Sequence, residues 1–112
     1  MVAPLQALVS RLEVKPLQSV LRTIGVAVKK QRRDAVAKQV YTMASYGPEC
    51  AVRISKELAN VLTRPILAEI CQELNIEVMG SRPTKQSLTT AIMNNVKDCY
   101  SGGWFHLKFY FH

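Results

Sequence analysis

The feature that most constrains the fold of this chain is an apolar pattern that recurs after about 50 residues. The first copy runs through residues 16–40 and the second through residues 65–96, and a basic residue followed by proline stands at each entrance. The spacing between the copies grows from 50 to 52 residues in the middle, where a loop absorbs the difference. A period of this length is typical of helical repeat units, so we interpret the pattern as a duplication. The matched positions are Leu17, Val20, Ile24, Val26 and Val28 with Leu67, Ile70, Leu74, Ile76 and Val78, followed by Arg33, Val36 and Val40 with Lys85, Leu88 and Ile92.

Each copy is predicted to form two helices joined by an extended loop. In the second copy, residues 67–74 carry apolar side chains at the i, i+3, i+4 and i+7 spacing of one helix face. Gly25 and Asn75 follow these first helices, and both residue types tolerate the positive φ that commonly ends a helix. The alternating residues 26–28 and 76–78 then predict a short extended stretch with one face buried.

The second helix of each copy is expected to begin after this loop. In the second copy, Gly80 and Pro83 forbid a continuous helix, and Ser81 or Thr84 is placed to cap the helix that follows. That helix presents Leu88, Ala91 and Ile92 on one side.

A further helix before each copy, at roughly residues 4–13 and 50–62, completes three helices per repeat. We therefore expect an all-α fold in which two repeats form one compact bundle. The expected segments are a basic first helical repeat at residues 1–48, a second helical repeat at residues 49–98, and an aromatic tail at residues 99–112.

The tail, CYSGGWFHLKFYFH, does not follow the helical pattern. Its residues alternate after the two glycines, and this period of two is typical of a strand. A lone strand cannot bury both faces, so we expect a short C-terminal strand that packs on the helices or pairs with another chain. The alternating sets are Phe105, Leu107, Phe109 and Phe111, and Trp104, His106, Lys108, Tyr110 and His112.

The helix–extended loop–helix pattern resembles the SAP domain and the related module at the N-terminus of the transcription terminator Rho. The SAP signature combines an apolar helix, a turn with a small and an apolar residue, a loop containing glycine, and a base followed by apolar residues three and seven positions later. The resemblance implies binding of double-stranded DNA, or of RNA in some relatives, through the loop and the N-terminus of the second helix. The residues that carry it are Ile24-Gly25-Val26, Arg33, Val36 and Val40 in the first copy, and Asn75-Ile76, Gly80, Lys85, Leu88 and Ile92 in the second.

The charge of the chain points to the same kind of ligand. The formal net charge is +7, and residues 1–48 carry most of the excess, with eight basic and two acidic residues. A basic segment of this kind usually meets a polyanion, and the start of a helix is itself an anion site because its first N–H groups are unpaired. The candidate phosphate-contacting residues are Lys29, Lys30, Arg32, Arg33 and Lys38 in the first copy and Gly80, Arg82 and Lys85 in the second.

Several other classes of protein are disfavoured. The three cysteines have no CxxC spacing and the two histidines have no neighbouring ligand pair, so we expect no metal site and no cofactor. No Ser/His/Asp or Cys/His set is visible, so we do not expect an enzyme. No apolar run is long enough for a membrane span, so integral membrane association is not expected. An amphipathic organelle-targeting segment at the N-terminus stays open, because Glu13 is the only acid before Asp34.

We therefore expect a non-catalytic nucleic-acid-binding module, with duplex DNA favoured and structured RNA next. The main alternative is a helical adaptor that binds a protein partner through the second repeat or the aromatic tail, its positive charge being incidental. A membrane-surface protein is a third, less favoured reading, because the basic cluster falls partly in a loop. The expected location is intracellular, with the nucleus or nucleoid favoured and the cytoplasm or an organelle left open.

Overall fold

The computed structural model describes the backbone of residues 3–28 and 31–110, and within these ranges the side chains as far as residue 99. This part of the chain contains helices and no strand, which confirms the all-α prediction. The helices are α1 (Ala3–Ser10), α2 (Val14–Thr23), α3 (Arg33–Ala44), α4 (Pro48–Asn60), α5 (Arg64–Glu73) and α6 (Lys85–Tyr110).

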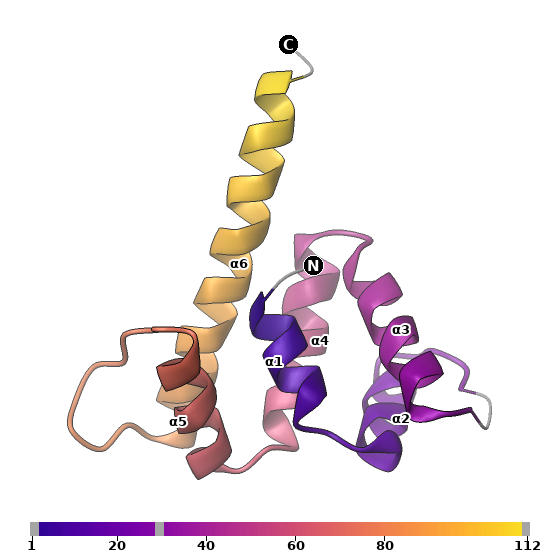
Figure 1. The fold of residues 1–112 in the computed structure, drawn as a ribbon, viewed down its shortest axis with the longest axis horizontal. Coiled ribbons are helices and arrows are strands. Elements are labelled where there is room, and N and C mark those ends of the chain that lie inside the picture. Colours follow the sequence, from indigo (N-terminus) through magenta and orange to yellow (C-terminus); the bar gives the residue numbers. More distant parts are fainter. Residues whose placement is uncertain (1–2, 29–30, 111–112) are drawn as a thin grey trace.

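Helices α1 and α4 lie in the middle of the bundle, with α2 and α3 on one side and α5 and α6 on the other (Figure 1). Helix α4 packs against α1, α2, α3 and α6, while α1 also packs against α5 and α6. A single apolar core joins all of these elements. Each helix contributes at least one leucine or valine that is at most 1% exposed, namely Leu8, Leu17, Val36, Leu58, Leu67 and Leu88. Burial of each such side chain stabilises the fold by roughly 1.5–3 kcal/mol before the entropic cost of ordering it.

The turns that end α2 and α5 have the same hydrogen bonds at an offset of 50 residues. The Val26 N–H donates to the Leu21 carbonyl at 2.9 Å, and the Ile76 N–H donates to the Cys71 carbonyl at 2.8 Å. This six-to-one bond requires a positive φ at the residue before the donor. Gly25 has a φ of +88° and Asn75 a φ of +55°, which confirms the helix ends predicted at these two residues.

The extended stretches that follow these turns also have the predicted alternation. Val26, Val28, Ile76 and Val78 are half-buried and pack against the core, whereas Glu77 between the last two is exposed. The chain then returns to begin α3 and α6. The two halves therefore share the order of their helices and the geometry of their turns, while duplication as their origin stays a prediction.

Two expectations about the second half are decided by the structure. Thr84, rather than Ser81, caps α6: its Oγ1 accepts the Ser87 N–H at 3.1 Å. The short C-terminal strand predicted within residues 99–112 is wrong, because α6 continues as a helix to Tyr110. A helix pairs its own backbone N–H and C=O groups, whereas a lone strand leaves them without partners, so helical continuation overrides the alternating pattern.

Candidate nucleic-acid interface

Helices α2, α3, α5 and α6 all begin along one edge of the molecule, where α1 and α4 end (Figure 1). We call this the basal edge and define it as residues 11–15, 31–34, 61–65 and 82–86. The first N–H groups of a helix have no partner within the helix, and the helix dipole places partial positive charge there. Four helix starts on one edge therefore produce a surface that attracts anions.

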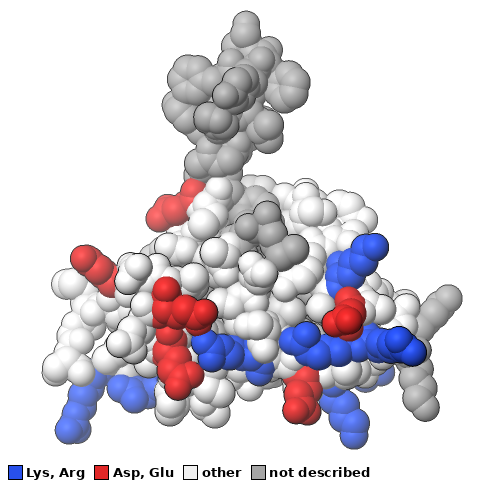
Figure 2. All heavy atoms as spheres, viewed as in Figure 1, with Lys and Arg blue, Asp and Glu red and all other residues white. Residues whose placement is uncertain are grey.

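Basic side chains add to the positive potential of the basal edge. Figure 2 shows Lys and Arg side chains along the lower border of the molecule, in the region of these helix starts, with a few acidic side chains among them. The exposed bases of the edge are Arg11, Lys15, Arg32, Arg64, Arg82 and Lys85, of which Arg11 pairs with Glu69 and Glu73. Of these, Arg32, Arg82 and Lys85 were singled out from the sequence. In the sequence, Lys15 and Arg64 stand out only as the bases that precede proline, not as phosphate-contacting candidates.

Arg33 has partners within the fold. Its Nε donates to the Leu12 carbonyl at 3.0 Å, and a terminal guanidinium nitrogen donates to the Val9 carbonyl at 2.8 Å. The side chain is half-buried, and these carbonyls lie at the C-terminal end of α1, where the helix dipole is negative. Arg33 therefore fastens the start of α3 to the end of α1, a structural role that its charge alone does not reveal.

Lys85 makes the corresponding contact in the second half. Its Nζ donates to the Asn60 carbonyl, at the end of α4, at 2.8 Å. The side chain is exposed, so the ammonium has further donors that face solvent. Next to it, Arg64 Nε donates to the Pro83 carbonyl at 2.7 Å and ties the loop to α5. Arg64, Arg82 and Lys85 meet with Pro83 and Thr84 around one shallow hollow at the start of α6.

The remaining candidate residues differ in their placement. Lys38 is exposed on the second turn of α3, beyond the basal edge. Gly80 has a φ of +93° in an exposed loop, and a Cβ added there would meet no atom within 4 Å, so the glycine serves the backbone turn rather than a close approach to another part of this chain. Lys29 and Lys30 lie outside the described residues.

A second basic surface was missed at the sequence level. Lys56, Lys85 and Lys97 line a groove of about 640 Å³ between α4 and α6, together with the amides of Asn60 and Asn94. No acidic residue of the described part of the chain lines this groove. These lysines are spread over two helices that meet only in the folded bundle, so no local sequence signal connects them. The groove adjoins the basal edge through Lys85 and extends the positive surface along α6.

Two side chains in the described part have displaced pKa values. Burial raises the pKa of the Cys71 thiol, as expected for a core cysteine. Burial also raises the pKa of the Tyr41 hydroxyl, and the positive charge of Arg33 opposes this shift. Among residues whose side chains are described, no group of three or more His, Cys, Asp or Glu is placed to hold a metal ion. No helix found there is both long and apolar enough to cross a membrane.

These observations define a small helical protein with a basic edge. Comparison with family models, with curated proteins and with solved structures found no match to this chain.

Proposed function

We propose that this protein is a non-catalytic nucleic-acid-binding module that contacts phosphates along its basal edge. The observation that carries the proposal is the convergence of four helix starts and six exposed basic residues, one of them ion-paired, on one edge of a molecule of net charge +7. Phosphate binding would relieve the unfavourable placement of bases at helix N-termini, because an anion compensates both the base and the helix dipole.

Duplex DNA is the favoured ligand, with structured RNA next. A row of separate helix starts fits a backbone that presents phosphates at intervals, and contacts of this kind carry little sequence information. The resemblance of each half to the SAP domain supports the same assignment, since that resemblance implies binding through the loop and the second helix. The lysine-lined groove between α4 and α6 adjoins the edge, so a nucleic-acid backbone bound at the edge can make further contacts there.

Fluorescence anisotropy of a labelled duplex at low and moderate salt tests the proposal. Two charge-matched double variants separate the edge from the net charge: Arg32→Gln with Arg82→Gln on the edge, and Arg22→Gln with Arg53→Gln away from it. All four side chains are exposed and make no hydrogen bond to a described residue, so both variants should fold. We expect the edge variant to bind about tenfold more weakly and to lower the salt slope by about two, one per lost phosphate contact.

The distal variant is expected to bind within about twofold of the parent, because screening limits the effect of distant charges. Equal losses in the two variants would assign binding to net charge alone and refute the basal edge as the site. Absence of duplex binding at low salt would refute the proposed function.

A further inference from the structure

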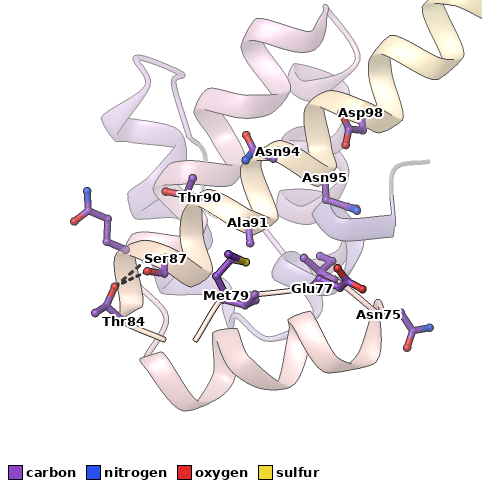
Figure 3. A pocket seen from close by; sticks show the side chains of 13 residues that line it. Asn75, Glu77, Met79, Thr84, Ser87, Thr90, Ala91, Asn94, Asn95 and Asp98 are labelled. Atoms are coloured by element: carbon purple, nitrogen blue, oxygen red, sulfur yellow. Dashed lines mark hydrogen bonds between the residues drawn. The ribbon is translucent and has the colours of Figure 1, made fainter. Parts of the chain in front are cut away.

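The two halves of the molecule differ where the extended stretch passes the second helix. In the first half, Gln39 on α3 donates its side-chain amide to the Ala27 carbonyl at 3.3 Å and bridges helix and stretch. The corresponding residues of the second half are Ala91 on α6, at an offset of 52, and Glu77, at an offset of 50. A methyl group cannot form this bridge. A groove of about 680 Å³ lies here, with Ala91 and Glu77 in its lining (Figure 3).

One wall of this groove is extended backbone with unused hydrogen-bonding groups. Ile76 and Val78 turn toward the core, which leaves Glu77 and Met79 outside, and Met79 is 93% exposed. The N–H groups of residues 77–79 make no hydrogen bond to any residue that the structure describes. An extended backbone with free N–H and C=O groups is the template on which a second extended segment pairs.

The opposite wall is the polar flank of α6. It presents Thr90, Asn94 and Asn95 above the small side chain of Ala91, which lies centrally in the view of Figure 3. Amides and hydroxyls of this kind can donate to or accept from a peptide backbone. The groove therefore combines an apolar base, a strand-like wall and a wall of hydrogen-bonding side chains.

The charge of the groove is opposite to that of the protein. Among the described residues, Glu77 and Asp98 are the only charged ones that line it, although the whole chain carries +7. Neither carboxylate forms an ion pair with a described residue. Figure 3 places Glu77, Asn95 and Asp98 toward one end of the groove and Thr84 and Ser87 toward the other. Two unpaired carboxylates repel phosphates and attract a basic side chain.

We propose that this groove, the acidic groove between residues 75–79 and α6, binds an extended peptide that carries a Lys or Arg side chain at the Glu77–Asp98 end. The extended residues 76–78 span about 10 Å, so the pairing segment is about three residues long. Backbone pairing with residues 77–79 provides affinity, and the carboxylates select the basic side chain. The groove meets the basal edge at Thr84 and Gln86, but the proposed peptide contacts at residues 77–79 and Asp98 lie outside that edge.

The test uses an acetylated hexapeptide of alternating threonine and valine with one lysine at its third position, and the same peptide with glutamate in place of the lysine. Amide chemical-shift changes in the labelled protein report binding up to millimolar concentrations and identify the contacted residues. We expect the lysine peptide to shift the amides of residues 77–79 and 90–98 and to bind about tenfold more tightly than the glutamate peptide, the equivalent of one ionic contact.

Two kinds of variant then locate the site. Ala91→Gln restores the bridging side chain and should weaken the lysine peptide about tenfold, whereas Ala35→Gln on the exposed face of α3 should leave it within twofold. Glu77→Lys with Asp98→Lys should reverse the preference toward the glutamate peptide. Equal binding of both peptides, equal effects of the two glutamine variants, or no shifts at millimolar peptide would each overturn the proposal. Duplex binding by Ala91→Gln should match the parent, which separates this result from any failure of the basal edge.

Discussion

Replacement of Arg33 by alanine should lower the free energy of unfolding, because this side chain makes hydrogen bonds within the fold. The guanidinium donates two hydrogen bonds, at 3.0 Å to the Leu12 carbonyl and at 2.8 Å to the Val9 carbonyl. Val9 belongs to the last turn of α1 and Leu12 follows that helix directly, so the side chain connects the end of α1 to α3. Arg33→Ala removes both bonds, although the Val9 carbonyl still accepts the Leu12 N–H at 3.1 Å.

The magnitude follows from these two bonds. A hydrogen bond from a charged donor contributes about 1.5–3 kcal/mol, and the half-buried position of Arg33 favours the lower value. Two such bonds give a loss of about 3 kcal/mol in the free energy of unfolding. With a urea m-value of about 1–3 kcal/mol/M, the unfolding midpoint should fall by about 1–3 M. Arg33→Lys keeps the charge but has no planar fork, so an intermediate loss is expected.

Urea unfolding followed by circular dichroism measures this effect, with the neighbouring Arg32→Ala as the control. The Arg32 side chain is exposed and makes no hydrogen bond to a described residue, so its replacement should change stability by at most about 0.5 kcal/mol. If Arg33→Ala and Arg32→Ala unfold at the same urea concentration, the structural role assigned to Arg33 is refuted. The duplex assay should accordingly use Arg32 and Arg82 and leave Arg33 intact.

Three further measurements address the core and the turns. Ser55 is completely buried and its hydroxyl has no partner among the described residues. Ser55→Ala should therefore raise the free energy of unfolding by about 0.5–1.5 kcal/mol. A lower free energy in urea unfolding would instead indicate a hydrogen bond that alanine removes. Gly25 has a φ of +88°, so Gly25→Val should lower the stability by at least about 1–2 kcal/mol. Gly25→Asn should lower it less, because Asn75 adopts a positive φ at the corresponding position. Equal losses of stability in thermal unfolding would contradict this. Burial raises the pKa of Tyr41 above 10.0, so the phenol ionises at a lower pH in the unfolded chain than in the folded protein. The stability of the fold should therefore decline as the pH rises above about 10. Tyr41→Phe should reduce that decline, and an unchanged stability profile would refute the assignment.

Much of the fold could be predicted because its signals are local. Apolar spacing identified the helices, and the residues able to adopt a positive φ, Gly25 and Asn75, identified two helix ends. The alternating stretch at residues 76–78 was also recognised, because one face of it packs on the core. The same local criterion failed in the tail, where alternation indicated a strand although no neighbouring strand exists among the described residues to pair with it.

The candidate site was less predictable because its chemistry depends on contacts between distant residues. Arg33 looks like any other base in a basic segment until the end of α1 is placed beside it. Lys56 and Lys97 belong to different helices and come together only when α4 packs on α6. The acidic groove depends on a difference between two corresponding positions, Gln39 in the first half and Ala91 in the second. The sequence shows this difference, but only the structure shows that the Gln39 side chain bonds to the extended stretch.

The position of α1 has a consequence for the order in which the protein can assemble during synthesis. This eight-residue helix leaves the ribosome before the others, yet it packs against α5 and α6. Its end is held there by Arg11, which pairs with Glu69 at 3.4 Å and with Glu73 at 2.6 Å, partners 58 and 62 residues further along the chain. A helix of this length is marginal by itself in water. Helix α4 can cover part of the apolar face of α1, but the remainder stays accessible to chaperones and proteases until α5 and α6 have left the ribosome.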